Sequence, residues 1–433
     1  MTKQQDFRVW ETDSGRTLPC GLLGRKLGHS YSPKIHGLMA DYAYHLFEKE
    51  PDELKAFIQT GDWKGLNVTI PYKKDVLAYC SRLSEAANAI GSVNTLVRMP
   101  DGGIYGDNTD AYGFGHLLDH NRIDPKGKKV LILGNGGACA SVQYVLEQRG
   151  ARVVVISRKG PDHYENLDRH KDATLIVNTT PLGMYPENGR QAVDLMCFPA
   201  AEAVLDLIYN PARTAIMMQA ERLGIRTDNG LYMLVAQAYA SSIQFQRPSG
   251  NTAEAASSKE PAAEIIEKIY DQLSFEMQNI ILIGMPGCGK SEVAKYLAKL
   301  TDREVLDLDE VFAETFSITP AECILQKGEE VFRKMESEII ADAGKRSGII
   351  ISTGGGCVTI PDNYPVLHQN GTIVWLRRDL NLLAKEGRPL SQQKGTESLY
   401  RLREPLYHAF SDIVIENDTT IEDAARRILQ ACS

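Results

Sequence analysis

Paired cysteines are absent from this sequence. The eight cysteines are scattered along the chain, and none forms a C-x-x-C pair. This spacing excludes the common zinc motifs and gives no disulfide framework, which fits a reducing cytosol. Long apolar runs are absent too, since none approaches the roughly 18 residues that span a bilayer. We therefore expect a cytoplasmic protein with no membrane partner.

An excess of positive charge is also absent. The chain has 48 Lys and Arg against 56 Asp and Glu, which gives a formal net charge of −8. Binding to nucleic-acid phosphates needs surplus cations, so we expect no nucleic-acid partner. At 433 residues the chain exceeds what one hydrophobic core usually serves, and we expect two or more domains.

Short apolar, β-branched runs alternate with segments of helix length. They lie at 130–133, 153–156, 175–177, 280–283 and 348–352. Buried parallel strands have this composition, so the sequence predicts α/β sheets. The small, polar, proline-bounded stretch 247–261 predicts a linker, and the apolar spacing in 262–273 predicts a helix after it.

A glycine turn follows the first of these predicted strands. The segment VLILGNGGACA (130–140) predicts a strand, a turn and then a helix over 141–149. Such a turn lets the backbone approach a pyrophosphate, and the residues concerned are Gly134, Gly136, Gly137 and Ala138. The turn alone is weak evidence, because any tight strand-to-helix connection can have this composition.

The next predicted strand ends in a basic turn made of Ser157, Arg158 and Lys159. A site for NAD would carry an acid here for the ribose hydroxyls, whereas a site for NADP would carry an arginine for the 2′-phosphate. The turn therefore favours NADP(H). A solvated basic turn without a ligand is the alternative.

Seven ordered blocks over about 20–275 resemble the shikimate dehydrogenases, and together they are far more specific than any one motif. The blocks are GLLGRKLGHSYSPKIH (21–36), GLNVTIPYK (65–73), GSVNT (91–95), GDNTD (106–110), NTTPLGM (178–184), DLIYNP (206–211) and GLYMLVAQA (230–238).

The resemblance implies reduction of 3-dehydroshikimate to shikimate with NADPH. Lys73 and Asp110 would face each other across the reacting oxygen, with Lys73 donating the proton as hydride arrives. The resemblance further implies that the substrate is bound by Ser30, Ser32, Thr69, Asn94 and Gln237, and that Gly183, Met184 and Gly230 belong to the cofactor site. We expect His29 and His36, which lie near the substrate loop, to be structural.

This module departs from the family at three places. The family usually has N-R-T and a further basic residue after the second cofactor strand, whereas this chain has SRKG (157–160). Only about sixteen residues separate Arg158 from the strand at 174–178, too few for a helix-strand-helix crossover. We therefore expect one element of the cofactor domain to be missing or abbreviated. Tyr232 stands where the family often has glycine.

A complete phosphate-binding loop opens the second module. The segment IILIGMPGCGKS (280–291) has the G-x-x-x-x-G-K-S pattern between a predicted strand and a helix predicted over 292–300. The amides of Gly287, Cys288 and Gly289 would hold the phosphates of ATP. Lys290 would reach the transferring group, and Ser291 would bind Mg²⁺.

The stretch from about 278 to 430 resembles the shikimate kinases. The matching motifs are VLDLD (305–309), FRKME (332–336), TGGG (353–356), GRPL (387–390) and REPLY (403–407). Each arginine alone could equally form a surface ion pair. The module departs from the family in a short lid around 385–395, in Glu292 where threonine is usual, and in Lys385 where an arginine often stacks on adenine.

This second resemblance implies phosphorylation of shikimate on its 3-hydroxyl with MgATP. Asp307 would support the magnesium shell, and Asp309 would act as the base for the acceptor hydroxyl. Arg333 and Arg403 would clamp the carboxylate in a geometry that lysine reproduces poorly. The lid arginine Arg388 would stabilise the transferring phosphoryl group, and the ring would approach the bare backbone of Gly354, Gly355 and Gly356.

The sequence thus predicts a bifunctional α/β enzyme whose two reactions are consecutive. The expected division is a dehydrogenase-like module at 1–275, with a substrate domain at 1–110 and 236–275 and a Rossmann-type domain at 111–235, then a P-loop domain of the nucleoside-monophosphate-kinase type at 276–433. A quinate dehydrogenase fused to a small-polyol kinase and a non-catalytic metabolite sensor are the alternatives. The sequence leaves the oligomeric state open.

Overall fold

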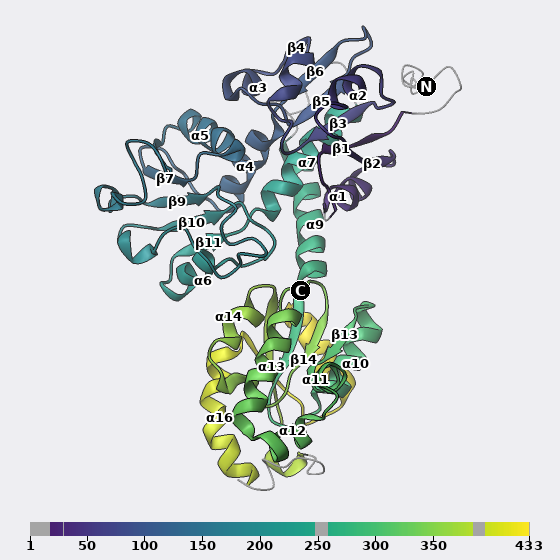
Figure 1. The fold of residues 1–433 in the computed structure, drawn as a ribbon, viewed down its shortest axis with the longest axis vertical. Coiled ribbons are helices and arrows are strands. Elements are labelled where there is room, and N and C mark those ends of the chain that lie inside the picture. Colours follow the sequence, from purple (N-terminus) through teal and green to yellow (C-terminus); the bar gives the residue numbers. More distant parts are fainter. Residues whose placement is uncertain (1–17, 29, 247–258, 384–394, 433) are drawn as a thin grey trace. The chain divides into compact units, whose positions relative to one another are not determined.

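The structure is a computed structural model that describes residues 18–28, 30–246, 259–383 and 395–432 (Figure 1). The chain divides into two compact units. The first comprises Met1–Pro181, Ala192–Ile208 and Gln219–Asp271, and the second comprises Leu182–Gln191, Tyr209–Met218 and Gln272–Ser433. No helix among the described residues is long and apolar enough to cross a membrane.

The first unit begins with a six-stranded sheet in the order β2-β1-β3-β5-β6-β4. Its strands are β1 (Cys20–Gly24), β2 (Tyr44–Glu48), β3 (Gly65–Val68), β4 (Arg82–Leu83), β5 (Thr95–Arg98) and β6 (Ile104–Asp107). β1 is parallel to β2 and β3, whereas β5 is antiparallel to β3 and β6. A core around Trp63, Leu66 and Leu96 fixes this sheet beside α2 (Leu54–Thr60) and α3 (Glu85–Ile90).

The second sheet is parallel throughout, in the order β11-β10-β9-β7-β8. Its strands are β7 (Lys129–Leu133), β8 (Arg152–Ile156), β9 (Leu175–Asn178), β10 (Ala203–Asp206) and β11 (Arg226–Asp228). The strand order reverses at β7, the position where α/β sheets bind ligands. The helix after β7, α5 (Gly137–Gln148), begins four residues before the predicted start at 141, because the glycine turn itself enters the helix.

The crossover from β8 to β9 is abbreviated, as the residue count predicted. The described residues between these strands form a 3-10 turn (Leu167–His170) and no further strand or α-helix. Hydrogen bonds inside the segment hold it together. Asp162 pairs with His170 at 2.9 Å, and Asn166 Nδ2 donates to Pro161 O at 2.9 Å.

Two long helices, α4 (Thr109–His120) and α7 (Leu231–Gln246), pack against each other in the first unit (Figure 1). Their close approach requires Gly113, since a Cβ there would lie 2.5 Å from the carbonyl oxygen of Met233. α4 carries Asp110 and α7 carries Gln237, so this contact brings two predicted site residues to one place.

The predicted boundary at 275/276 lies inside a helix. α9 (Lys259–Met277) begins inside the stretch predicted as a linker, whose residues 247–258 lie outside the described residues. The helix ends four residues later than expected, because Leu273 and Met277 continue the buried stripe that begins at Ala262 and Ile266. The division between the two units also falls within α9, after Asp271.

The second unit contains a parallel sheet in the order β13-β14-β12-β15-β16. Its strands are β12 (Asn279–Ile283), β13 (Val305–Asp307), β14 (Ile350–Ser352), β15 (Gly371–Arg377) and β16 (Ile413–Glu416). Helices cover this sheet, namely α10 (Lys290–Thr301), α11 (Leu308–Phe316), α12 (Pro320–Lys327), α13 (Glu329–Ala343), α14 (Asn363–His368), α16 (Thr396–Phe410) and α17 (Ile421–Cys432). α10 begins two residues before the predicted 292, since Lys290 already lies in its first turn.

Candidate active sites

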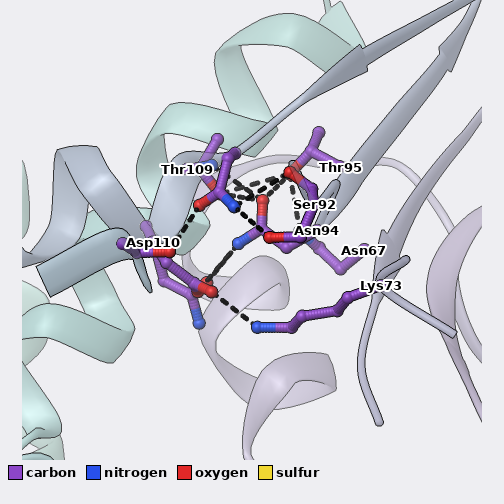
Figure 2. A network of polar contacts seen from close by, with 10 residues as sticks. Asn67, Lys73, Ser92, Asn94, Thr95, Thr109 and Asp110 are labelled. Atoms are coloured by element: carbon purple, nitrogen blue, oxygen red, sulfur yellow. Dashed lines mark hydrogen bonds and ion pairs between the residues drawn. The ribbon is translucent and has the colours of Figure 1, made fainter. Parts of the chain in front are cut away.

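The first candidate site lies at the N-terminus of α4. Lys73 comes from the loop after β3, and its Nζ donates to Oδ2 of Asp110 at 2.5 Å (Figure 2). The Asp110 side chain is almost fully buried, whereas that of Lys73 is 23% exposed. The structure therefore brings the predicted pair together and leaves the Lys73 side chain partly exposed.

Asn94 holds the carboxylate of Asp110 from the other side. Its Nδ2 donates to Asp110 Oδ1 at 2.8 Å and to Gln237 Oε1 at 3.0 Å, and its Oδ1 accepts from the Thr109 amide at 2.7 Å. Asn94 is buried, and these contacts use both of its amide hydrogens. The side chain predicted to bind substrate therefore also orients Asp110.

Two asparagines that the sequence did not single out support this network. Asn67 accepts from Tyr44 Oη at 2.8 Å. Asn108 donates to the oxygens of Ser92 at 3.0 Å and accepts from Ser141 Oγ, on α5, at 3.2 Å. Both asparagines lie within the recognised motifs. Asn67 had a signal in the sequence, a polar amide between the apolar residues of a strand, since buried amides need partners.

The two predicted serines lie at the start of α1 (Ser32–Met39). Ser30 Oγ accepts from the Ser32 amide at 3.2 Å, and both residues are half-buried. The Thr69 amide donates to Leu23 O at 2.9 Å, which attaches the start of the Lys73 loop to β1. His29 lies outside the described residues.

His36 is part of a buried aromatic cluster. Its Nδ1 shares a hydrogen bond with Tyr42 Oη at 2.5 Å, and its ring stacks on Tyr44 at 4.1 Å. Burial lowers the pKa of His36 to about 3. These contacts support the structural role predicted for it.

The candidate cofactor turn has room for a ligand. A Cβ added at Gly136 or Gly137 would meet no atom within 4 Å, and α5 presents its first amides there. Gly134 has a φ of +95°, and a Cβ there would lie 2.7 Å from the Thr180 methyl group. The glycines thus shape an open turn at a helix N-terminus, with Ala138 in the first turn of the helix.

The basic turn after β8 is held in place by Ser157, which is buried and donates to Lys159 O at 2.5 Å. Arg158 and Lys159 are exposed, so both cations can meet a ligand.

The three remaining predicted cofactor residues are divided between the units. Gly183, with a φ of +109°, and Met184, which is 44% exposed, belong to the second unit. Gly230 belongs to the first unit, where a Cβ would lie 2.1 Å from Leu207 O, so only glycine fits.

Packing explains how a tyrosine fits at position 232, where the family often has glycine. The tyrosine is buried, its ring stacks on His120 at 4.0 Å, and Tyr270 of α9 lies edge-on at 5.2 Å. The tyrosine therefore docks α9 onto α4 and α7.

The second candidate site is a cavity of about 510 Å³ in the second unit. Half of the residues that line it were predicted, namely Gly287, Gly289, Lys290, Ser291, Asp309, Arg333, Gly354, Gly355, Gly356 and Arg403. Glu336 and Arg378 also line it, although the sequence did not single them out. Arg388 and Lys385 lie outside the described residues.

The phosphate-binding loop has the backbone that its glycines require. Gly289 has a φ of +95°, and Lys290 Nζ donates to Gly284 O at 3.0 Å and Met285 O at 3.1 Å. Ser291 Oγ donates to Asp307 Oδ2 at 2.6 Å, while Asp307 Oδ1 accepts from the Asp309 amide at 3.1 Å and caps α11. A hydroxyl and a carboxylate thus meet beside the loop, and these oxygen ligands suit Mg²⁺.

Charged side chains are buried at the opposite side of the cavity. Arg333 Nη1 lies 2.6 Å from Glu336 Oε2, and both side chains are almost fully buried. Burial raises the pKa of Glu336, and Arg333 opposes this increase. A Cβ at Gly356 would lie 1.9 Å from Arg333 Nη2, so a larger residue there would displace this buried guanidinium group.

Comparisons with known proteins match both halves of the chain. A family model described as shikimate dehydrogenase substrate binding domain matches residues 22–96, and one described as shikimate kinase matches 286–433. A shikimate dehydrogenase (NADP(+)) of Clostridium perfringens is 36% identical over 239 residues, covering 50% of this chain and 88% of that protein. The corresponding Clostridium beijerinckii protein is 38% identical with the same coverage.

Solved structures give the same result for the first half. A chorismate mutase/shikimate 5-dehydrogenase fusion protein from Clostridium acetobutylicum is 37% identical, with a TM-score of 0.54, and the match covers 60% of this chain and 97% of that one. Shikimate dehydrogenase 1 from Peptoclostridium difficile is 33% identical, with a TM-score of 0.52 and coverage of 60% and 99%.

His36 predicts a loss of stability in acid. The unfolded chain binds a proton at His36 below pH 6.5, whereas the folded chain does so only near pH 3, so stability falls as the pH falls. The contribution is about 2 kcal/mol between pH 7 and pH 5. Urea unfolding at pH 7 and pH 5 measures the free energy of unfolding. Between these pH values it should decline less in His36→Gln than in wild type, by this amount. The exposed-histidine control His45→Gln should decline as wild type does. An equal decline in all three proteins would contradict the prediction.

Proposed function

We propose that this chain, which belongs to the shikimate dehydrogenase family and carries a shikimate kinase domain, catalyses two consecutive reactions. The two parts make it a bifunctional enzyme of the shikimate pathway. The first reduces 3-dehydroshikimate with NADPH, and the second phosphorylates the resulting shikimate with MgATP. The ion pair between Lys73 and Asp110, next to Gln237, is the observation that carries the first assignment.

The dehydrogenase reaction needs a hydride and a proton. NADPH supplies the hydride to the keto carbon, and Lys73 donates the proton to the keto oxygen. Asp110 holds the Lys73 side chain in position, and Asn94 keeps the carboxylate in place. Ser30, Ser32, Thr69, Asn94 and Gln237 bind the carboxylate and hydroxyl groups of the ring.

The open glycine turn fits the pyrophosphate of NADP(H). Gly136, Gly137 and Ala138 lie at the N-terminus of α5, where backbone amides and the helix dipole attract phosphate. Arg158 and Lys159 bind the 2′-phosphate, and Gly183, Met184 and Gly230 belong to the nicotinamide side.

The kinase reaction transfers a phosphoryl group from ATP to the 3-hydroxyl of shikimate. Asp309 orients that hydroxyl and accepts its proton, while Lys290 and Arg388 stabilise the transferring group. Ser291 and Asp307 hold Mg²⁺, and Arg333 and Arg403 bind the carboxylate of shikimate. The shared cavity supports this assignment, since it joins the phosphate-binding loop to Asp309 and both arginines.

We keep the proposed division into a substrate domain (1–110 and 236–275), a cofactor domain (111–235) and a kinase domain. Two details of the structure differ from this division. The compact units place Leu182–Gln191 and Tyr209–Met218, which the division puts in the cofactor domain, with the second unit. The other difference concerns α9. Because the helix continues to Met277, the kinase domain begins at β12, and a cut at 275/276 would sever an intact helix.

Arg158→Ala should weaken NADPH binding by about 10- to 150-fold and leave NADH binding almost unchanged. The change removes a charge-assisted contact to the 2′-phosphate, which NADH lacks. Isothermal titration with both cofactors measures the effect, with Arg152→Ala, at the other end of β8, as the control. If both cofactors weaken equally, Arg158 has only a structural role.

Lys73→Ala should lower dehydrogenase kcat by about 10²–10⁴, the usual contribution of a positioned proton donor. Shikimate binding should persist, because the donor acts on the transition state. The exposed neighbour provides the control Lys74→Ala, which should keep wild-type kcat. Unchanged kcat with a raised KM would instead assign Lys73 to substrate binding.

Asp309→Asn should abolish most kinase activity and leave the dehydrogenase unchanged, because it removes a carboxylate while keeping size and polarity. With 3-dehydroshikimate, NADPH and MgATP, the variant should accumulate shikimate, which wild type converts to the 3-phosphate. Glu310→Gln, one residue along α11, is the matched control. Normal phosphorylation by the variant, or loss of its reductase, would contradict the separation of sites. A wild-type chain that turns over neither substrate would favour a metabolite sensor.

A further inference from the structure

The glycine triplet of the kinase site touches the phosphate-binding loop at one residue. A Cβ added at Gly355 would lie 2.6 Å from Cδ of Pro286 and 2.9 Å from its backbone nitrogen. No flexible side-chain end separates the two segments, so the backbone of Gly355 packs directly on Pro286. The position of Gly355 therefore sets the spacing between the two loops, and glycine is the residue that permits it.

Two side chains of α16 fix the carbonyl group of Gly355. Tyr407 Oη donates to this oxygen at 2.5 Å, and Arg403 Nη1 donates to it at 3.1 Å. Tyr407 is fully buried, and burial raises the pKa of its hydroxyl, so it is a neutral donor at physiological pH. Its ring stacks on Trp375 at 5.6 Å, and its Oη lies 3.8 Å from Sδ of Met285 in the phosphate-binding loop.

The orientation of this carbonyl determines where the next amide points. In a trans peptide, the C=O of Gly355 and the N–H of Gly356 point in opposite directions. With the carbonyl held by Tyr407 and Arg403, the Gly356 amide is directed away from α16. Within the described part of the chain this amide donates to no acceptor, and Gly356 lines the cavity.

We propose that Tyr407 is a positioning residue for the phosphoryl acceptor. Its hydroxyl, together with Arg403, sets the peptide between Gly355 and Gly356 so that the Gly356 amide faces the acceptor. The same hydrogen bond keeps Gly355 packed against Pro286. This contact fixes the position of the acceptor relative to the phosphate donor. This role rests on the kinase function proposed above.

Tyr407→Phe in the full chain tests the proposal, because it removes the hydroxyl and keeps the buried ring. Kinase rates are measured against shikimate at saturating MgATP, and against MgATP at saturating shikimate. We expect KM for shikimate to rise about 3- to 10-fold, the effect of one net hydrogen bond, with a smaller fall in kcat. KM for MgATP should stay within about twofold, since Arg403 still holds Gly355 in contact with the loop.

Tyr400→Phe is the matched control. Tyr400 lies on the same helix and donates to Glu404 Oε1 at 2.9 Å, away from the glycine triplet. Tyr400→Phe should leave KM for shikimate and KM for MgATP unchanged. The dehydrogenase rate and the thermal unfolding midpoint of each sample show whether the chain is folded.

A structural hydrogen bond alone would give a different result. If Tyr407→Phe lowers the unfolding midpoint but leaves KM for shikimate at the wild-type value, the positioning role is overturned and the kinase assignment stands. If wild type phosphorylates no shikimate at all, the kinase assignment fails and the positioning role fails with it. A rise in KM for shikimate in Tyr407→Phe, and not in Tyr400→Phe, supports the proposal.

Discussion

The cavity of the second unit and the glycine turn of the first unit depend on one constraint, that the ends of parallel strands meet at a common edge of the sheet. In the second unit β12 leads into the phosphate-binding loop, β13 ends at Asp307, and β14 leads into the glycine triplet. The three strands are neighbours, so groups separated by up to about 70 residues in the chain line one cavity. The glycine turn after β7 lies at the corresponding edge of the parallel sheet in the first unit. The polar groups of the cavity and of the glycine turn therefore lie at the carboxyl ends of the strands, where open α/β sheets bind ligands.

The residues of the first candidate site could be predicted from the sequence, whereas the contacts that orient them could not. Lys73 and Asp110 lie in motifs whose residue types match their chemistry, and the structure joins them at 2.5 Å. The contact of Asn94 with Gln237 joins positions 143 residues apart, and no local pattern encodes such a pairing. The burial of Glu336 could not be predicted for a similar reason. A glutamate on a helix suggests solvent until the fold buries it beside Arg333.

The boundaries of helices and strands also depend partly on neighbouring residues and partly on contacts between distant residues. Counting residues was enough to predict the short crossover after β8, because chain length limits which elements can fit. The start of α5 and the end of α9 were misplaced because glycine and polar residues suggested turns. In α9 tertiary contacts overrode local propensity, since Ile269, Leu273 and Met277 are buried and the helix continues to Met277.

The substitution at position 232 shows how a departure from a family pattern can be compensated. Tyr232 lies in the first turn of α7, two residues after Gly230 of the proposed nicotinamide side, and a bulky ring there needs a place to pack. His120 provides a stacking partner from the last turn of α4, and Tyr270 closes the cluster from α9. Because Asn121, next to His120, also donates to Asp228 at 2.8 Å, the turn that leads to Gly230 is held from two sides. The extra ring therefore stabilises the start of α7, the helix that carries Gln237 to Asn94, which holds Asp110.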